Sequence, residues 1–89
     1  MKIEVETKNI KEVKEALRCD VDVIMLDNMS IPIMKKAVDL VNGRTLLEAS
    51  GNVSLENVAD IAAIGVDYIS VGELTHSVRG ADISLKIIA

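Results

Sequence analysis

The feature that most constrains this chain is a regular alternation of strand-like and helix-like segments. Four strand-like segments cover 2–6, 22–27, 45–50 and 67–72, and their last residues are separated by 21, 23 and 22 positions. Strand–helix–strand units of this length, joined by short loops, form parallel sheets with right-handed crossovers. The spacing therefore predicts an α/β fold built from parallel βα repeats.

The segments between these strands carry helix-capping signals. An Asn or Ser stands before each helix-like run, and such residues cap the first backbone N–H groups of a helix. The third helix is expected to begin after Ser54, with Leu55 on its buried face. After the fourth strand, residues 73–80 are predicted to form a loop with a helical turn. The predicted N-caps are Asn9, Ser30 and Ser54.

The pattern within the strands distinguishes two kinds of parallel sheet. One face of each predicted strand is apolar, whereas the opposite face carries Glu4, Glu6 and Glu48. A doubly wound sheet would bury these carboxylates under helices, at a large cost without partners. A barrel would turn them inwards, where active sites lie at one end. Because a complete barrel needs roughly 200 residues or more, we favour about half of an incomplete TIM-type barrel.

Composition excludes several functional classes. The net charge is −4 and Tyr68 is the only aromatic residue, whereas nucleic-acid readers need basic surfaces or stacking aromatics. No apolar stretch approaches the roughly 18 residues of a membrane span, and the N-terminus lacks an apolar signal region. The lone Cys19 cannot form an internal disulfide. We therefore expect a cytoplasmic protein without nucleic-acid or membrane partners, with residues 1–89 forming a single, partial α/β-barrel domain.

Candidate functional residues stand where the predicted strands end. Glu6 and Asp27 end adjacent strands, about 4.8 Å apart, so their carboxylates could share Mg²⁺ or contact ribose hydroxyls. The alternative is that Asp27 only caps a loop and Glu6 is solvated. Residues 50–52 and 71–73 each place a glycine after a strand, and their backbone N–H groups, with a helix N-terminus, predict a phosphate site. His76, the only histidine, is either a surface or a functional residue.

Five motifs in a fixed order resemble one enzyme family. The combination of LDN, EASG and SVG-x-LTH is specific, although each motif alone is weak. The chain resembles, over essentially its whole length, the C-terminal part of quinolinate phosphoribosyltransferase, also called carboxylating nicotinate-nucleotide pyrophosphorylase. The resemblance implies a Mg²⁺-dependent reaction of NAD biosynthesis, in which quinolinate and phosphoribosyl pyrophosphate give nicotinate mononucleotide, pyrophosphate and CO₂. The motifs are IEVE, IMLDNM, LLEASGNVSLENV, GVDYISVGELTHS and ADISLKI.

The resemblance also implies roles for the candidate residues. Glu6 and Asp27 would be the catalytic acidic pair that contacts the ribose and its metal. Asn52 replaces a glycine found in many members, although Asn tolerates left-handed geometry, and Glu73 replaces a frequent alanine, so its charge could weaken anion binding. Asp20 replaces a glycine at a helix end. The implied substrate- and phosphate-binding residues are Ser50, Gly51, Asn52, Val71, Gly72, Glu73 and His76.

The resemblance implies that part of the site is missing. In the family, the cationic residues that bind the two carboxylates of quinolinate lie upstream of the motifs found here. We therefore expect a C-terminal fragment of an oligomeric transferase that is inactive alone. The alternative is a self-associating structural half-barrel without activity; another phosphate-binding barrel enzyme would explain the glycines but not the full motif set. Open strand edges and an apolar inner face predict a homodimer or larger assembly.

Overall fold

The strands form one five-stranded sheet in chain order, β1-β2-β3-β4-β5. The computed structural model describes residues 2–71 and 74–77. β1 to β4 run parallel to one another, and β5 runs antiparallel to β4. The predicted α/β fold of parallel repeats is therefore confirmed. The elements are β1 (Glu4–Thr7), α1 (Ile10–Leu17), β2 (Val23–Asp27), α2 (Ile31–Val41), β3 (Leu46–Ser50), α3 (Val58–Ala63), β4 (Tyr68–Val71) and β5 (Leu74–Ser77).

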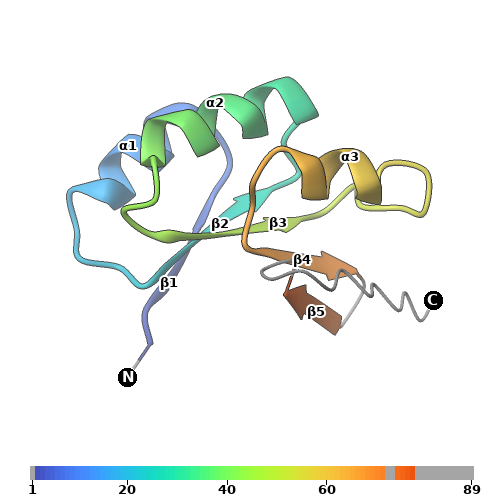
Figure 1. Ribbon diagram of the computed structural model, residues 1–89. Helices are drawn as coiled ribbons and strands as arrows, with labels where there is room; N and C mark the ends of the chain where they lie inside the picture. The colour runs from blue at the N-terminus through green and yellow to red at the C-terminus, as the bar shows by residue number, and fades with distance from the viewer. Residues whose placement is uncertain (1, 72–73, 78–89) are drawn as a thin grey trace.

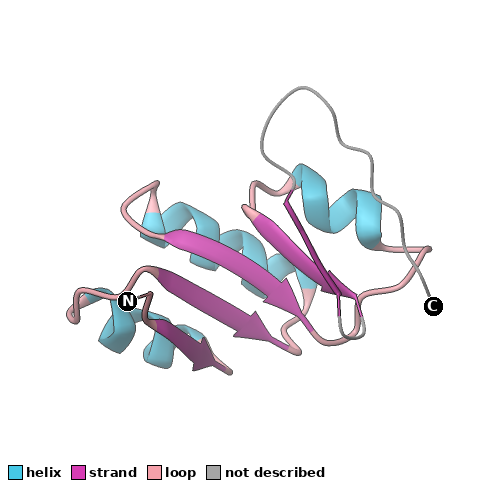
Figure 2. Ribbon diagram, turned by 90° about the horizontal axis from the view of Figure 1, so that it is seen from below, coloured by secondary structure: helices cyan, strands magenta, loops and turns pink. Residues whose placement is uncertain are grey.

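The helices of the described residues, α1, α2 and α3, all lie on the same face of the sheet (Figure 1). In the view from below, the strands lie in front of the helices, and no described helix covers this second face (Figure 2). A doubly wound sheet would carry helices on both faces, so the arrangement agrees with the barrel-type prediction. No helix in the described part of the chain combines the length and the apolar character needed to cross a bilayer.

The hydrophobic core lies between the helices and the sheet. Side chains reach it from every helix and from alternate positions of β2, β3 and β4, because successive strand residues point to opposite faces. Removal of this apolar surface from water is the main favourable contribution to folding. The apolar residues that are at most 1% exposed are Val13, Ile24, Leu26, Ala37, Val41, Ala49, Ile61 and Ile69.

The first two helices begin where the capping signals predict. The Asn9 side chain caps α1 by accepting a hydrogen bond from the Glu12 N–H at 2.9 Å. The Glu12 carboxylate accepts in turn from the Lys8 N–H at 2.7 Å, so the capping is reciprocal and reaches one residue further back than a standard capping box. Ser30 is the N-cap residue of α2, but its side chain makes no capping hydrogen bond.

The predicted start of the third helix was wrong. α3 begins at Val58, and residues 54–57 form the turn before it, in which the Ser54 carbonyl accepts from the N–H groups of Asn57 at 3.2 Å and Val58 at 2.9 Å. The Asn57 side chain accepts a hydrogen bond from the Ser54 N–H at 2.8 Å and donates one to the Asn52 carbonyl at 2.6 Å. Leu55, expected on the buried face, is 76% exposed as a result.

The prediction of a helical turn after the fourth strand was also wrong for the residues that are described. Leu74–Ser77 form β5, which pairs with β4 from Tyr68 opposite Ser77 to Val71 opposite Leu74. The pairing satisfies backbone N–H and C=O groups that β4 would otherwise present at an open edge. The rest of the segment 73–80, and the predicted apolar terminal segment, lie outside the described residues.

Candidate active site

The carboxyl ends of β1, β2 and β3 meet at one edge of the sheet. The strand register places Glu6 beside Met25, and Asp27 beside Ser50. Glu6 and Asp27 are therefore diagonal neighbours on adjacent strands and on the same face, because side chains two residues apart on a strand share a face. The predicted proximity of the Glu6 and Asp27 carboxylates is therefore confirmed.

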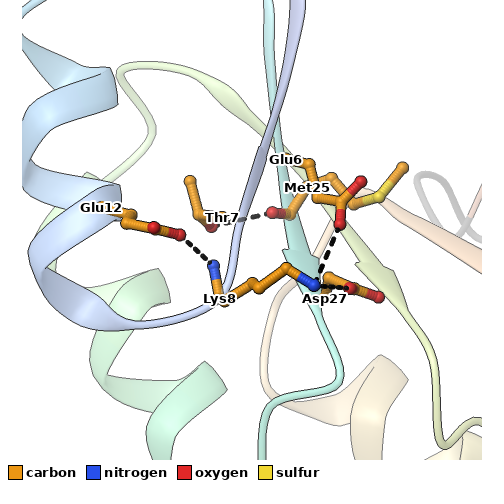
Figure 3. Close-up of polar contacts among 6 residues, drawn as sticks. All are labelled: Glu6, Thr7, Lys8, Glu12, Met25 and Asp27. Carbon is orange, nitrogen blue, oxygen red and sulfur yellow. Dashed lines mark hydrogen bonds and ion pairs between the residues drawn. The ribbon is translucent and has the colours of Figure 1, made fainter.

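Lys8 lies between the two carboxylates. Its Nζ is 3.4 Å from Asp27 Oδ2 and 3.6 Å from Glu6 Oε1 (Figure 3). The hydrogen bond to Asp27, the charge of Asp27 and that of Glu6 raise the pKa of Lys8 above its ordinary value. Sequence reasoning missed this residue. The sequence did contain one indication of its role. Lys8 comes two residues after Glu6, the predicted end of the first strand, and so lies at the edge of the sheet where Asp27 was also expected.

The backbone before and at Lys8 is held in place by two hydrogen bonds. Thr7 is fully buried, and its Oγ1 donates to the Met25 carbonyl oxygen at 2.8 Å. The Lys8 N–H donates to Glu12 Oε1 at 2.7 Å (Figure 3). The end of β1 is thus tied to β2 on one side and to α1 on the other, so the Lys8 side chain starts from a fixed point.

Gly51 allows the loop after β3 to approach the end of β2. The Asn28 N–H donates to the Ser50 carbonyl oxygen at 2.8 Å, which extends the β2–β3 pairing beyond both strands. Gly51 has a φ of +74°, and a Cβ atom there would lie 3.1 Å from the Asn28 nitrogen and 3.2 Å from Asp27 Oδ1. The sequence analysis assigned this glycine to a predicted phosphate site. The structure shows that it makes room for the β2 loop, beside the candidate carboxylate.

The loop after Gly51 keeps the left-handed turn that was expected at Asn52. Asn52 has a φ of 52°, and Asn28, on the neighbouring loop, has a φ of 58°. Asparagine visits this region more readily than most residues. The helix N-terminus expected to follow at once is absent from this position, because α3 begins only at Val58. An anion bound here would therefore contact the N–H groups of the loop itself.

A second pair of carboxylates lies further from this edge, on the uncovered face. Glu48 is 8% exposed, and its carboxylate accepts a hydrogen bond from the Ser70 hydroxyl. A hydrogen bond with Glu48 raises the pKa of Glu4, and desolvation and the Glu48 charge raise it further. Both carboxylates border a hollow of ≈ 330 Å³, whose other lining residues are Lys2, Val23 and Tyr68.

These positions can be compared with known proteins. A family model described as "Quinolinate phosphoribosyl transferase, C-terminal domain" matches residues 1–86. The chain belongs to the quinolinate phosphoribosyltransferase family. The resemblance seen in the sequence motifs is therefore confirmed.

Members of the quinolinate phosphoribosyltransferase family from distant organisms match nearly the whole chain. A tobacco (Nicotiana tabacum) protein named quinolinate phosphoribosyltransferase (decarboxylating) 2b, mitochondrial, is 50% identical over 96% of the chain. A probable carboxylating nicotinate-nucleotide pyrophosphorylase of Methanocaldococcus jannaschii is 40% identical over 98% of it. The chain spans 28% and 33% of the length of these two relatives. It therefore represents about a third or less of such a protein.

A solved structure of the same family shares the fold. The crystal structure of nicotinate-nucleotide pyrophosphorylase from Ehrlichia chaffeensis superposes with a TM-score of 0.73 at 57% sequence identity. The match covers 75% of this chain and 24% of that one. The βα repeats described above thus correspond to about a quarter of that crystallised chain.

The structure describes only some of the residues to which the quinolinate phosphoribosyltransferase resemblance gives roles. Glu6, Asp27 and the segment 50–52 lie together at the edge formed by β1, β2 and β3. Val71 and His76 are placed only by their backbones, as the last residue of β4 and a residue of β5. Gly72 and Glu73 lie outside the described residues. The structure gives positions and not roles, so the roles of all these residues stay predictions.

The carboxylate pair suits the Mg²⁺ that the quinolinate phosphoribosyltransferase resemblance implies. Within 2–71 and 74–77, no three His, Cys, Asp or Glu side chains are grouped closely enough to hold a metal by themselves. Mg²⁺ does not need such a group, because it is commonly bound through one or two carboxylates, with waters and substrate phosphates completing its shell. Glu6 and Asp27 offer this donor set, and both already pair with one positive charge, the Lys8 ammonium.

Proposed function

We propose that this chain carries the phosphoribosyl side of a quinolinate phosphoribosyltransferase active site. The reaction is the conversion of quinolinate and phosphoribosyl pyrophosphate into nicotinate mononucleotide, pyrophosphate and CO₂. The observation that carries the proposal is the meeting of Glu6, Asp27 and Gly51 at one edge of the sheet. Family membership supports the reaction class, and this geometry supports the placement of the residues.

In this proposal the carboxylates act by electrostatics and by orientation. Glu6 and Asp27 would hold Mg²⁺, which supplies neutralisation of the pyrophosphate charge when it is bound. The same two carboxylates orient the ribose hydroxyls and stabilise the positive charge that develops on the ribose as pyrophosphate leaves. Fixed charges of this kind favour the transition state because they need no reorganisation during the reaction.

The phosphate-binding role belongs to the loops after the third and fourth strands. Gly51 lies at this edge, where an added Cβ would meet the β2 loop at 3.1–3.2 Å, and the backbone N–H groups of such loops bind phosphate without a basic side chain. His76 is proposed to help position the phosphate. The proposed contacts are Ser50, Gly51, Asn52, Val71, Gly72, Glu73 and His76.

A binding titration tests the carboxylate assignment. Isothermal titration calorimetry with phosphoribosyl pyrophosphate and Mg²⁺ should show that Asp27→Asn weakens binding about tenfold or more. Asp39→Asn is the matched control, because Asp39 is an exposed carboxylate on α2 that also pairs with a lysine, Lys35, at 3.1 Å. If Asp27→Asn binds as the wild type does, the phosphoribosyl site lies elsewhere.

Two further outcomes follow from the proposal. The 89-residue chain alone should form no nicotinate mononucleotide, because the cations that bind quinolinate in the family are absent from the matched segment. Measurable turnover by the purified chain would contradict this expectation.

Gly72→Val should abolish the residual affinity for phosphate. An unchanged affinity would mean that the anion binds elsewhere.

A self-associating half-barrel is the second candidate, and the uncovered face of the sheet favours it. Met25, Leu46 and Tyr68 are partly exposed on that face, and partly exposed apolar groups favour association with another chain. We propose a homodimer or larger assembly, which sedimentation at about micromolar concentration would detect. A 9.6 kDa monomer whose sedimentation does not depend on concentration would exclude it.

A reducing, cytoplasmic compartment is the proposed setting. Cys19 is exposed and forms no disulfide, as is usual in reducing compartments. The tobacco relative is named as mitochondrial, so the alternative is an organelle. Fractionation of the source cells followed by immunodetection would separate the two.

A further inference from the structure

Lys8 occupies the space that a metal ion would need. Its ammonium group lies 3.4 Å from Asp27 Oδ2 and 3.6 Å from Glu6 Oε1, and Figure 3 shows it reaching both carboxylates from the end of β1. In the described part of the chain, every ion pair of Glu6 and Asp27 is made with Lys8. A cation that binds Asp27 Oδ2 and Glu6 Oε1 therefore competes with the ammonium group for the same oxygen atoms.

The binding partner available to the displaced Lys8 ammonium depends on the ligand that enters. A bare divalent cation brings no anion, so Lys8 would exchange two carboxylates for water. A divalent cation complexed with diphosphate brings phosphate oxygens, which a lysine binds readily as a mobile point charge. The backbone of Lys8 is fixed by the hydrogen bond to Glu12, but its side chain is 68% exposed and is free to turn from the carboxylates to a bound phosphate.

We propose that Lys8 is a specificity-determining residue, which makes the Glu6–Asp27 pair reject free divalent cations and accept the complex of a cation with a diphosphate-bearing ligand. The inference rests on the proposed function, because it takes these carboxylates as the metal-binding pair. It goes further by assigning a role to a residue outside the acidic pair and the phosphate loops. Lys8 thereby links arrival of the metal to arrival of the diphosphate.

Equilibrium binding of Mn²⁺, followed by water-proton relaxation, tests the proposal with and without inorganic diphosphate. Mn²⁺ accepts the same oxygen donors as Mg²⁺. A unit charge at this distance in a watery environment changes an affinity by about three- to tenfold. Lys8→Gln should therefore bind free Mn²⁺ three- to tenfold more tightly than the wild type, and Mn²⁺–diphosphate more weakly by a similar factor.

Two variants separate this role from a general effect of charge. Lys35→Gln removes the same charge from another exposed lysine–aspartate pair, and it should leave both affinities within about twofold of the wild type. Lys8→Arg keeps the charge and should restore both affinities toward the wild-type values. The proposal is overturned if Lys8→Gln changes neither affinity, changes both in the same direction, or behaves as Lys35→Gln does.

The same titrations distinguish failure of the inference from failure of the proposed site. If Asp27→Asn abolishes Mn²⁺ binding but Lys8→Gln leaves it unchanged, the carboxylate site stands and the role of Lys8 is wrong. If Mn²⁺ binds equally well to the wild type, Glu6→Gln and Asp27→Asn, the metal site is wrong and the inference falls with it. Absence of Mn²⁺ binding by Lys8→Gln at millimolar concentration also overturns both.

Discussion

The two faces of the sheet are made from alternate residues of the same strands but have opposite character. On β2, Ile24 and Leu26 are fully buried beneath the helices, whereas Met25 and Asp27 remain partly exposed on the other face. The covered face is apolar, and the uncovered face carries carboxylates at several positions. One face therefore specifies the fold, while the other is left for chemistry and for contact with further protein. If this division is correct, substitutions on the two faces should have unequal effects.

Truncation of the covered face should cost far more than truncation of the uncovered face. Leu26→Ala removes a fully buried side chain and should lower the free energy of unfolding by about 3 kcal/mol, the usual cost of such a cavity. Met25→Ala, next to it on the same strand, should cost less than about 1 kcal/mol because that side chain is already partly in water. Urea denaturation measures both. Equal losses would show that the second face is packed in solution, as it would be in an assembly.

Substitution of Gly51 should destabilise the contact between the loops that follow β2 and β3. Gly51→Ala combines a left-handed φ of +74° with contacts of 3.1–3.2 Å from the new Cβ to the β2 loop, so we expect a loss of about 2 kcal/mol. Gly43→Ala is the control, because Gly43 also has a positive φ but has no atom within 4 Å of an added Cβ. It should cost about 1 kcal/mol. Equal losses in urea denaturation would mean that backbone conformation alone requires glycine.

Replacement of Thr7 tests how much one buried hydrogen bond stabilises the helix-covered face, which is otherwise mostly apolar. Thr7→Val keeps the shape but removes the hydroxyl that donates to the Met25 carbonyl. It should lower stability by about 1 kcal/mol, the usual net contribution of such a bond. Thr45→Val is the comparison, since the Thr45 hydroxyl makes only a long bond of 3.5 Å. If Thr7→Val is as stable as the wild type, burial of the added methyl group offsets the lost hydrogen bond.

The smallest effect concerns the carboxylates of the uncovered face. The pKa of Glu4 is raised above its ordinary value of 4.5 by Glu48 and by burial. The protonated form of Glu4 therefore stabilises the fold below about pH 4.5, and this contribution is lost as the pH rises through the raised value. Glu4→Gln should stabilise the chain by a few tenths of a kcal/mol at pH 7, because solvent screens the repulsion.

The pH dependence provides the check on Glu4. The advantage of Glu4→Gln in urea denaturation should shrink as the pH falls toward 4, where the wild-type carboxyl becomes neutral. Glu56→Gln, an exposed glutamate in the turn before α3, should show no such trend. A constant difference between pH 4 and 7 would mean that Glu4 and Glu48 do not interact in solution.

The sequence predicted the covered face better than the connections around it. The strands that contain Ile24, Leu47 and Ile69 were placed to within a residue or two, because alternation of apolar side chains is a strong local signal. The start of α3 was missed because a turn over 54–57 precedes the helix, and the local sequence does not distinguish this turn from the first turn of the helix itself. β5 was missed because Gly72, which stands first of the two residues between β4 and β5 and is typical of a two-residue hairpin loop, was assigned to a phosphate site instead.

The candidate site was predicted in the same uneven way. The proximity of Glu6 and Asp27 followed from the strand spacing, since parallel strands in sequence order bring their carboxyl ends together. The bridging position of Lys8 did not follow, because it depends on the length and direction of one exposed side chain. The contact of Gly51 with the Asp27–Asn28 segment likewise depends on three-dimensional approach, which sequence spacing does not report.

The order of the strands also has a consequence for folding during synthesis. Because β1 to β5 lie side by side in chain order, each new strand pairs with the one synthesised just before it, and none has to insert between two others. A ribosome adds about 5–20 residues per second, so a repeat of about 22 residues emerges in roughly 1–4 s. Helices and adjoining strands form in microseconds to milliseconds. The nascent chain can thus complete one unit while the next is still being made, and it grows its sheet from the edge that was formed last.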